Sequence, residues 1–213
     1  MKDAARVLGR KGWLSETPES FQQALLSRCD QIRLRSGDPV YRHGETVGGI
    51  FGIVTGRVEF HLPHLKEGRS LCHVAGAGNW FGDLAAVSGN ARRFEVRARE
   101  ESILVRLSRA EMMRLVEDRP DAWKYVAGLL ASNLAVTLDY VEATKSQSSL
   151  ARVRAVLRYL VRHGGGEPDA LNISQDDLAA ISGLSRKSTN SAVKQLEAAG
   201  EITISYRSIR VNH

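Results

Sequence analysis

The sequence predicts an α+β fold, with an antiparallel β domain first, a long helix after it, and a helix-turn-helix with a β-hairpin at the C-terminal end. Three observations predict it. Residues 31–107 hold short β-prone runs separated by glycines, residues 120–144 carry apolar side chains at three- and four-residue intervals, and residues 174–211 combine two capped helical segments with alternating strands. We place the domain boundaries at 1–119, 120–145 and 146–213.

The N-terminal region begins with helical sequence and then changes to β. Residues 1–30 are helical in pattern, with a start signal at Thr17-Pro18-Glu19. The strands expected after this region are 32–34, 40–41, 50–54, 57–62, 70–74, 95–98 and 103–107. Short strands joined by glycine turns are typical of a sandwich or barrel. The Thr55-Gly56 turn between two of these strands predicts a β-hairpin.

One long departure from alternation interrupts the β region between Asn79 and Arg93. A short helix is expected to begin at Gly82-Asp83, and Arg92 and Arg93 follow at the far end of the segment. Helix N-termini bind anions through free N–H groups, so a phosphate could lie between the helix and these arginines. The alternative is a capped surface helix with two solvated arginines.

The long helix carries an apolar seam. A short helix is expected over 111–116, and Pro120 suits the first turn of the helix that follows. The seam consists of Ala127, Leu130, Leu134, Thr137 and Val141. Other apolar residues flank it, so one side can pack on the β domain and the other on a partner helix. We therefore predict a parallel dimer, the alternative being a single core helix.

The polar stretch 145–149 is the expected hinge, and an amphipathic helix is expected over 150–162. Two capped helices follow. Ser174 can cap the first helix with Asp177 as its reciprocal partner, and Gly183 supplies a turn residue. Ser185 can cap the second helix. This spacing is that of a helix-turn-helix.

The second helix of this unit has one apolar and one polar face. Ala192, Val193 and Leu196 are expected to dock, which leaves a basic and polar face free for DNA. The alternative is an ordinary helical hairpin with a solvated charged face. Residues 201–211 alternate around a turn near Arg207, which predicts the hairpin of a winged helix and places Arg207 near a phosphate backbone.

Composition is consistent with an anionic partner and gives no sign of a metal centre. The net charge is +6 and the pI about 9.6. Cys29 and Cys72 are isolated, so we expect neither a disulfide framework nor a zinc or iron–sulfur site, and a reduced cytoplasm as the location. The N-terminus lacks an apolar targeting region, and no run approaches the ~18 apolar residues of a membrane span, so no membrane partner is expected.

Several motifs together resemble the CRP/FNR family of bacterial transcription regulators. The segments are GDPVYRHGE, IVTGRVEF and WFGDLA in the β region, the long helix, and LSRKSTNSAVKQLEAAGEI near the C-terminus. The resemblance covers nearly the whole chain. It implies a homodimer with a jelly-roll-like β-roll that senses an effector, a dimerisation helix and a winged helix-turn-helix. It also implies a palindromic double-stranded operator and RNA polymerase as partners.

In family members that bind cyclic nucleotides, a phosphate cassette reads Phe-Gly-Glu-Leu and, about ten residues on, Arg-Ser/Thr-Ala. Here Asp83 replaces the Glu that holds the ribose hydroxyl, Arg92 matches the phosphate-binding Arg, and Arg93 and Phe94 replace the small pair. Thr137 falls at the position of a base-contacting Thr, with Leu138 replacing the following Ser. The candidate effector residues are Gly82, Asp83, Leu84, Arg92, Arg93 and Thr137.

These departures leave the effector open. Cyclic AMP or cyclic GMP is a candidate, and a different small molecule or a dimer that binds DNA without an effector are the alternatives. Iron–sulfur members need an N-terminal cysteine cluster, which residues 1–28 lack. Haem is not excluded, because His43, His61, His64 and His73 lie in the β region, although single histidines on strands are more often hydrogen-bonded residues than ligands.

On the DNA side, Ser185-Arg186 matches the family's Ser-Arg, and the resemblance implies that Arg186 reads a guanine. Lys187 replaces the Glu of the cyclic AMP receptor, and Ser191 replaces its second base-reading Arg, so a different half-site is expected. The expected DNA contacts are Gln175, Ser185, Arg186, Lys187, Asn190, Ser191, Lys194 and Arg207. The two recognition helices of a dimer should lie ~34 Å apart, one DNA turn.

Two other classes of function compete with this interpretation. A cupin-like metal oxygenase needs two or three histidines and a carboxylate converging in the barrel. His61 and His64 are three apart, which puts them on opposite faces of a strand, so we expect no enzyme. A nucleotide-binding regulatory module acting through protein contacts is the second alternative, and the predicted recognition helix and wing argue against it.

Overall fold

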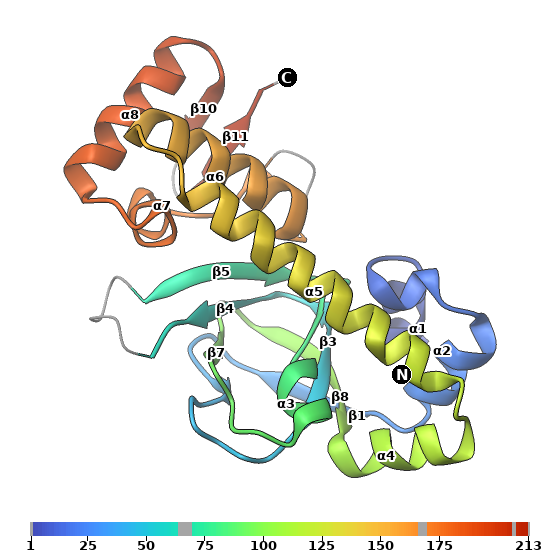
Figure 1. Ribbon diagram of the computed structural model, residues 1–213. Helices are drawn as coiled ribbons and strands as arrows, with labels where there is room; N and C mark the ends of the chain where they lie inside the picture. The colour runs from blue at the N-terminus through green and yellow to red at the C-terminus, as the bar shows by residue number, and fades with distance from the viewer. Residues whose placement is uncertain (1, 64–69, 166–169, 206–207, 213) are drawn as a thin grey trace. The chain divides into compact units, whose positions relative to one another are not determined.

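The computed structural model describes residues 2–63, 70–165, 170–205 and 208–212. Figure 1 shows short helices and β-strands in the N-terminal half, a long helix and a C-terminal helical region, so the predicted α+β class is confirmed. The chain forms two compact units: Met1–Glu59 with Gly76–Ala135, and Phe60–Ala75 with Val136–His213. The second unit therefore contains a segment of the β region as well as the C-terminal helices.

The first unit contains short helices and the start of the long helix as well as strands. The helices are α1 (Lys2–Leu8), the 3-10 helix η1 (Trp13–Glu16), α2 (Glu19–Leu26), α3 (Asp83–Ser88), α4 (Arg109–Asp118) and the first part of α5 (Ala122–Thr144). Pro18 stands at the N-cap of α2, as the start signal predicted. At α4, the Ser108 hydroxyl accepts a hydrogen bond from the backbone N–H of Glu111. The long helix begins two residues beyond Pro120, at Ala122.

All seven predicted strands of the β region are present within two residues of their expected ends. They are β1 (Asp30–Leu34), β2 (Pro39–Tyr41), β3 (Gly49–Thr55), β4 (Arg57–His61), β5 (Leu71–Gly76), β7 (Glu95–Ala98) and β8 (Ser102–Ser108). The sequence missed β6 (Trp80–Phe81), because two residues are too few to show alternation. One sheet has the order β1-β8-β3-β6 and the other β2-β7-β4-β5.

The hairpin predicted at Thr55-Gly56 is wrong. β3 pairs with β8 and β6, whereas β4 belongs to the other sheet, so this turn carries the chain from one sheet to the next. Gly56 has φ 78°, and a Cβ on it would lie 2.3 Å from the Ser102 hydroxyl. The β3–β8 register also shifts between Ile53 and Thr55, a bulge that bends the strand. Local sequence shows a turn but not the strand with which each arm pairs.

The first core explains which face of α5 is buried. Val126 and Leu129 of α5 join Phe21, Leu107 and Leu115 in one apolar cluster, and all five side chains are inaccessible or nearly so. Trp13 donates a 2.8 Å hydrogen bond from its indole N–H to the Tyr125 carbonyl oxygen. The prediction that one face of the long helix packs in a core is therefore confirmed for this part of α5.

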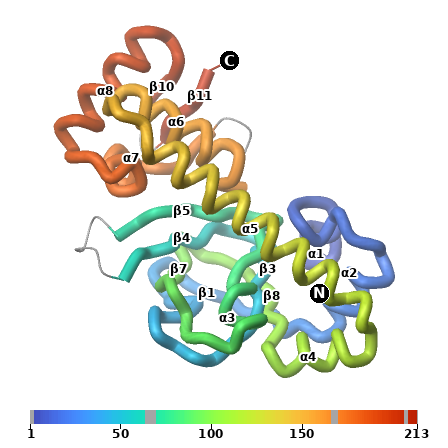
Figure 2. The backbone as a smooth tube through the Cα atoms, viewed as in Figure 1, coloured from blue at the N-terminus to red at the C-terminus, as the bar shows by residue number. Residues whose placement is uncertain are grey.

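The second unit is built around α6 (Ser149–His163). The Ser148 hydroxyl caps α6, and the helix contacts α7 (Gln175–Ser182), α8 (Arg186–Ala198) and the three-stranded sheet β10-β11-β9. These strands are β9 (Ala170–Leu171), β10 (Ile202–Ser205) and β11 (Ser208–Val211). In Figure 2 the chain runs from α6 through α7 and α8 to the β10–β11 hairpin. Leu71 and Val74 of β5 belong to the same core as Val156 and Leu160 of α6.

Candidate DNA interface and effector cassette

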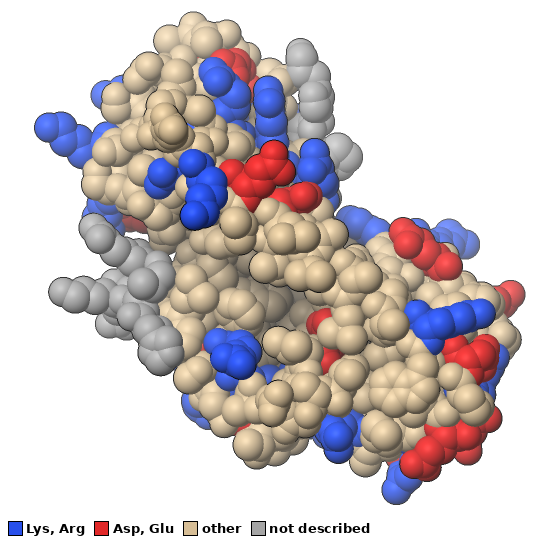
Figure 3. All heavy atoms as spheres, in the orientation of Figure 1, with Lys and Arg blue, Asp and Glu red and all other residues tan. Residues whose placement is uncertain are grey.

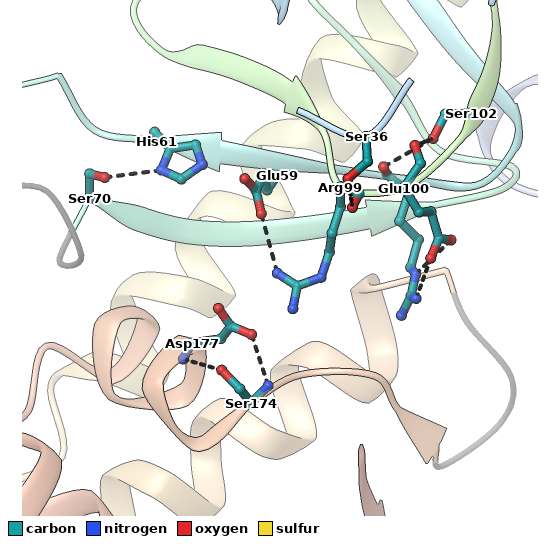
Figure 4. Close-up of polar contacts among 10 residues, drawn as sticks. Ser36, Glu59, His61, Ser70, Arg99, Glu100, Ser102, Ser174 and Asp177 are labelled. Carbon is teal, nitrogen blue, oxygen red and sulfur yellow. Dashed lines mark hydrogen bonds and ion pairs between the residues drawn. The ribbon is translucent and has the colours of Figure 1, made fainter. Parts of the chain in front are cut away.

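The first helix of the helix-turn-helix starts with the predicted capping box. The Ser174 hydroxyl accepts from the backbone N–H of Asp177 at 3.1 Å, and the Asp177 carboxylate accepts from the backbone N–H of Ser174 at 2.8 Å (Figure 4). The box satisfies two amide donors that a helix start leaves unpaired. Asp177 is therefore occupied with its own helix, and its neighbour Asp176 is exposed.

The turn between α7 and α8 has the expected backbone. Gly183 adopts φ 63° and ψ 30°, the left-handed conformation that glycine tolerates, and its N–H closes the end of α7. The Ser185 hydroxyl then accepts from the backbone N–H of Ser188 at 3.1 Å and caps α8. Ser185, expected at the DNA, thus holds the start of the helix that carries the other expected contacts.

The two faces of α8 divide as predicted. Ala192, Val193 and Leu196 are almost inaccessible and pack in the second core. The exposed residues of the opposite face include Arg186, Lys187, Asn190, Ser191 and Lys194. Figure 3 shows several separate basic side chains on the face of the C-terminal unit that is in view. Gln175 is half-buried at the start of α7, and Arg207 lies outside the described residues.

An ion pair links the two helix starts. Arg186 Nε lies 2.8 Å from Asp176 Oδ1, and both side chains are exposed, at 78% and 59% of their surface. This pair could not be predicted from the sequence, because two residues ten apart, in two helices joined by a turn, have no fixed distance between their side chains. Arg186 is therefore the only one of the eight predicted DNA-contacting residues with an ion pair among those the structure describes.

The predicted cassette forms a compact polar site in the first unit. Gly82 precedes α3 with φ 88°, and a Cβ on it would lie 2.7 Å from the Gly49 carbonyl oxygen and 2.9 Å from Arg92 Nη1. Only glycine fits both the backbone conformation and this close approach. Asp83 follows as the first residue of α3, as predicted, and is 6% exposed.

Asp83 is held by the long helix of its own chain. Asn133 of α5 donates from Nδ2 to Asp83 Oδ1 at 2.7 Å and to the Trp80 carbonyl oxygen at 3.2 Å. Burial raises the pKa of Asp83, and the hydrogen bond from Asn133 partly opposes that rise. Asn133 is a residue that the sequence interpretation missed. Its polar side chain lies one turn before Thr137, the residue expected to contact an effector, and this spacing is the signal that could have found it.

Arg92 is turned into the protein and bonded to backbone oxygens. It is 3% exposed, and it donates from Nη1 to the Gly82 carbonyl at 2.8 Å and from Nη2 to the Gly49 carbonyl at 2.9 Å. Its guanidinium carbon lies 4.2 Å from the centre of the Tyr41 ring, a cation–π contact. Arg92 Nε is buried without a hydrogen-bond partner. Burial lowers the pKa of Arg92, but an arginine keeps its charge in proteins.

The structure brings together three of the six predicted effector residues, Gly82, Asp83 and Arg92. Leu84 is exposed although it lies in the same helix, and Arg93 is exposed beside the buried Arg92. Thr137 is an exposed residue of α5 and belongs to the second compact unit. Arg92 and Arg93 therefore differ in exposure, a difference that the sequence alone did not predict.

Among the described residues, no group of three or more His, Cys, Asp or Glu side chains is placed to hold a metal ion. Burial raises the pKa of both Cys29 and Cys72 to about 12, so these thiols stay protonated. His64 of the haem alternative lies outside the described residues. Within the part of the chain that is described, no helix has the length and hydropathy of a membrane span.

Two family models match the chain. Residues 31–119 match the cyclic nucleotide-binding domain, and residues 151–213 match the Crp-like helix-turn-helix domain. The Cyclic AMP receptor protein of Thermus thermophilus is 24% identical over 194 residues, covering 91% of this chain and 88% of that protein. A CRP-like cAMP-activated global transcriptional regulator of Mycobacterium tuberculosis is 22% identical, with coverage of 97% and 94%.

Solved structures share the fold at low identity. FixK2 from Bradyrhizobium japonicum has a TM-score of 0.74 at 18% identity, covering 87% of this chain and 93% of that chain. The c-di-GMP responsive global regulator CLP of Xanthomonas campestris has a TM-score of 0.70 at 18% identity, with coverage of 92% and 100%. At such identities the likeness concerns the fold alone.

Proposed function

Because this chain belongs to the CRP/FNR family of transcription regulators, we propose that it binds a palindromic DNA operator as a homodimer. The observation that carries the proposal is α8. Its apolar face is buried, its start is capped by Ser185, and Arg186, Lys187 and Lys194 are exposed on it. A helix of this kind fits the major groove, where Arg can donate two hydrogen bonds to guanine O6 and N7.

The dimer is proposed from the free face of α5. Leu134, Leu138 and Val141 are exposed, and intervals of four and three residues place them along one side of the helix. An apolar stripe of this length is the usual signature of a helix that pairs with a second copy. Leu138 takes a place in this stripe that the predicted seam did not include.

The cellular role follows from these partners. Bound at a promoter, the dimer would regulate transcription through RNA polymerase, and it would do so in the bacterial cytoplasm, where the chromosome lies. We propose no catalytic activity, because the family acts by binding. A regulatory module working only through protein contacts would leave the exposed cations of α8 without a role.

Substitution of Arg186 is expected to reduce affinity and selectivity together. Selection from a random duplex library would first define the operator, and fluorescence anisotropy would then measure affinity. Arg186→Ala should weaken operator binding by about 1 to 3 kcal/mol and relax the preference at one base pair, whereas Lys194→Ala should weaken all duplexes alike and reduce the salt dependence. If both variants bind the operator as the parent does, α8 is not the recognition helix.

For the effector, we propose an anionic small molecule, with cyclic AMP and cyclic GMP as the first candidates. The support is the charged Arg92 with one buried donor unpaired, placed beside the start of α3. The hydrogen bonds that Arg92 and Asp83 already make would have to change when such a ligand binds. A phosphate would have to replace the Gly82 and Gly49 carbonyls on the guanidinium, and a ribose hydroxyl would have to share Asp83 with Asn133.

Calorimetric titration with cyclic AMP and cyclic GMP tests this proposal. We expect heat of binding in the parent and in Arg93→Ala, and none in Arg92→Lys, which keeps the charge but loses the forked donors. Arg93 is the matched control because it is adjacent and exposed. Thermal melting would verify that Arg92→Lys remains folded. Absence of heat in the parent would favour another ligand or a regulator without an effector.

A further inference from the structure

The ion pair between α7 and α8 lies where DNA would meet the protein. Asp176 is the second residue of α7 and Arg186 the first residue of α8, and 2.8 Å separates Asp176 Oδ1 from Arg186 Nε. Both side chains are exposed, so the pair is not part of the core. The capping role at this helix start already belongs to Asp177, which leaves the carboxylate of Asp176 available for another task.

The ion pair involves Nε of Arg186, which leaves its two terminal nitrogens for DNA. A guanidinium has five N–H donors in a rigid plane, and guanine recognition uses a parallel pair of them against O6 and N7. Asp176 approaches Nε, so the two terminal nitrogens remain open toward a base. An unrestrained arginine loses side-chain entropy on binding, and a carboxylate paired with it favours one side-chain conformation and so reduces that loss.

The charge of Asp176 also acts against wrong sequences. A carboxylate beside a phosphate backbone weakens binding to every duplex, and only a sequence that satisfies Arg186 offsets this repulsion. We propose that Asp176 is a specificity-determining residue that positions Arg186 for a guanine and penalises DNA lacking it. This inference rests on the proposed DNA-binding function and adds a residue that does not itself contact a base.

The test compares Asp176→Asn with the parent by anisotropy, on the selected operator and on the same duplex with the Arg186-dependent guanine pair replaced. Asn has the same shape and removes the charge. We expect Asp176→Asn to bind the altered duplex about two- to fivefold more tightly than the parent does. The preference for the guanine should be about three- to tenfold smaller, an effect of the size expected when an Asp–Arg ion pair partly desolvated at DNA is lost. A merely structural role would weaken binding to both duplexes.

Two controls make the result decisive. Asp177→Asn removes the neighbouring charge in the same helical turn, and it should lower thermal stability without changing the base preference. In an Arg186→Ala background, Asp176→Asn should leave the remaining selectivity unchanged. An unaltered guanine preference in Asp176→Asn, with the parent still selective through Arg186, would refute the inference and leave the proposed function intact. A parent without sequence preference would instead refute the proposed function.

Discussion

Replacing Leu138 with aspartate is expected to yield a folded monomer that binds its operator at least about a hundredfold more weakly than the parent. Leu138 is 59% exposed on α5, so the change removes little from the core of one protomer. In a dimer the same position would be buried against the partner, where an unpaired carboxylate is strongly unfavourable. Loss of the dimer removes the bivalent contact with two half-sites, an advantage of about 10² to 10⁴ in affinity.

Sedimentation velocity at low micromolar concentration would report the monomer, and anisotropy would report operator affinity. Ser132→Asp is the matched control, because Ser132 is exposed on the same helix and lies about 120° around its axis from Leu138. It should leave both measurements unchanged. A parent that is monomeric at these concentrations, or a Leu138→Asp variant that remains dimeric, would contradict the proposed pairing along α5.

The sequence predicted local features well because short-range chemistry determines them. The capping box at Ser174 and Asp177, the left-handed Gly183 and the exposed face of α8 all depend on residues within a few positions of each other. Strand positions were predictable for the same reason, since alternation and glycine turns are local signals. The partners of those strands were not, as the wrong hairpin at Thr55-Gly56 shows.

The position of the cassette could be predicted from the sequence, but the contacts of its side chains could not. The motif placed Gly82, Asp83 and Arg92 together, and the structure confirms that they are neighbours. Whether Arg92 would turn inward depended on the Gly49 carbonyl oxygen of β3, 43 residues away, and the partner of Asp83 was Asn133, 50 residues away. Contacts over such separations follow from packing, which no spacing in one sequence specifies.

Acidification is expected to destabilise the second unit through His73. Burial lowers the pKa of His73 from 6.5 to about 3, and the nearby His163 contributes to this decrease. The Tyr159 hydroxyl lies 2.7 Å from His73 Nδ1, and the Tyr140 ring contacts the Tyr159 ring. Asp139 Oδ2 lies 2.8 Å from His163 Nε2 and 3.0 Å from Arg162 Nη1. Between pH 6.5 and pH 3, His73 binds a proton in the unfolded chain but stays neutral in the folded unit. The contribution of His73 to the stability of the second unit is therefore constant above about pH 6.5 and falls as the pH decreases toward 3.

Hydrogen exchange of α6 amides, corrected for intrinsic rates, would measure this loss in the second unit. At pH 5 we expect the opening free energy to be about 1 to 2 kcal/mol lower than at pH 7. His73→Gln keeps a polar side chain near Tyr159 without titrating, so most of this difference should disappear, whereas His43→Gln, at an exposed histidine, should retain it. An undiminished pH dependence in His73→Gln would contradict the assignment of this effect to His73.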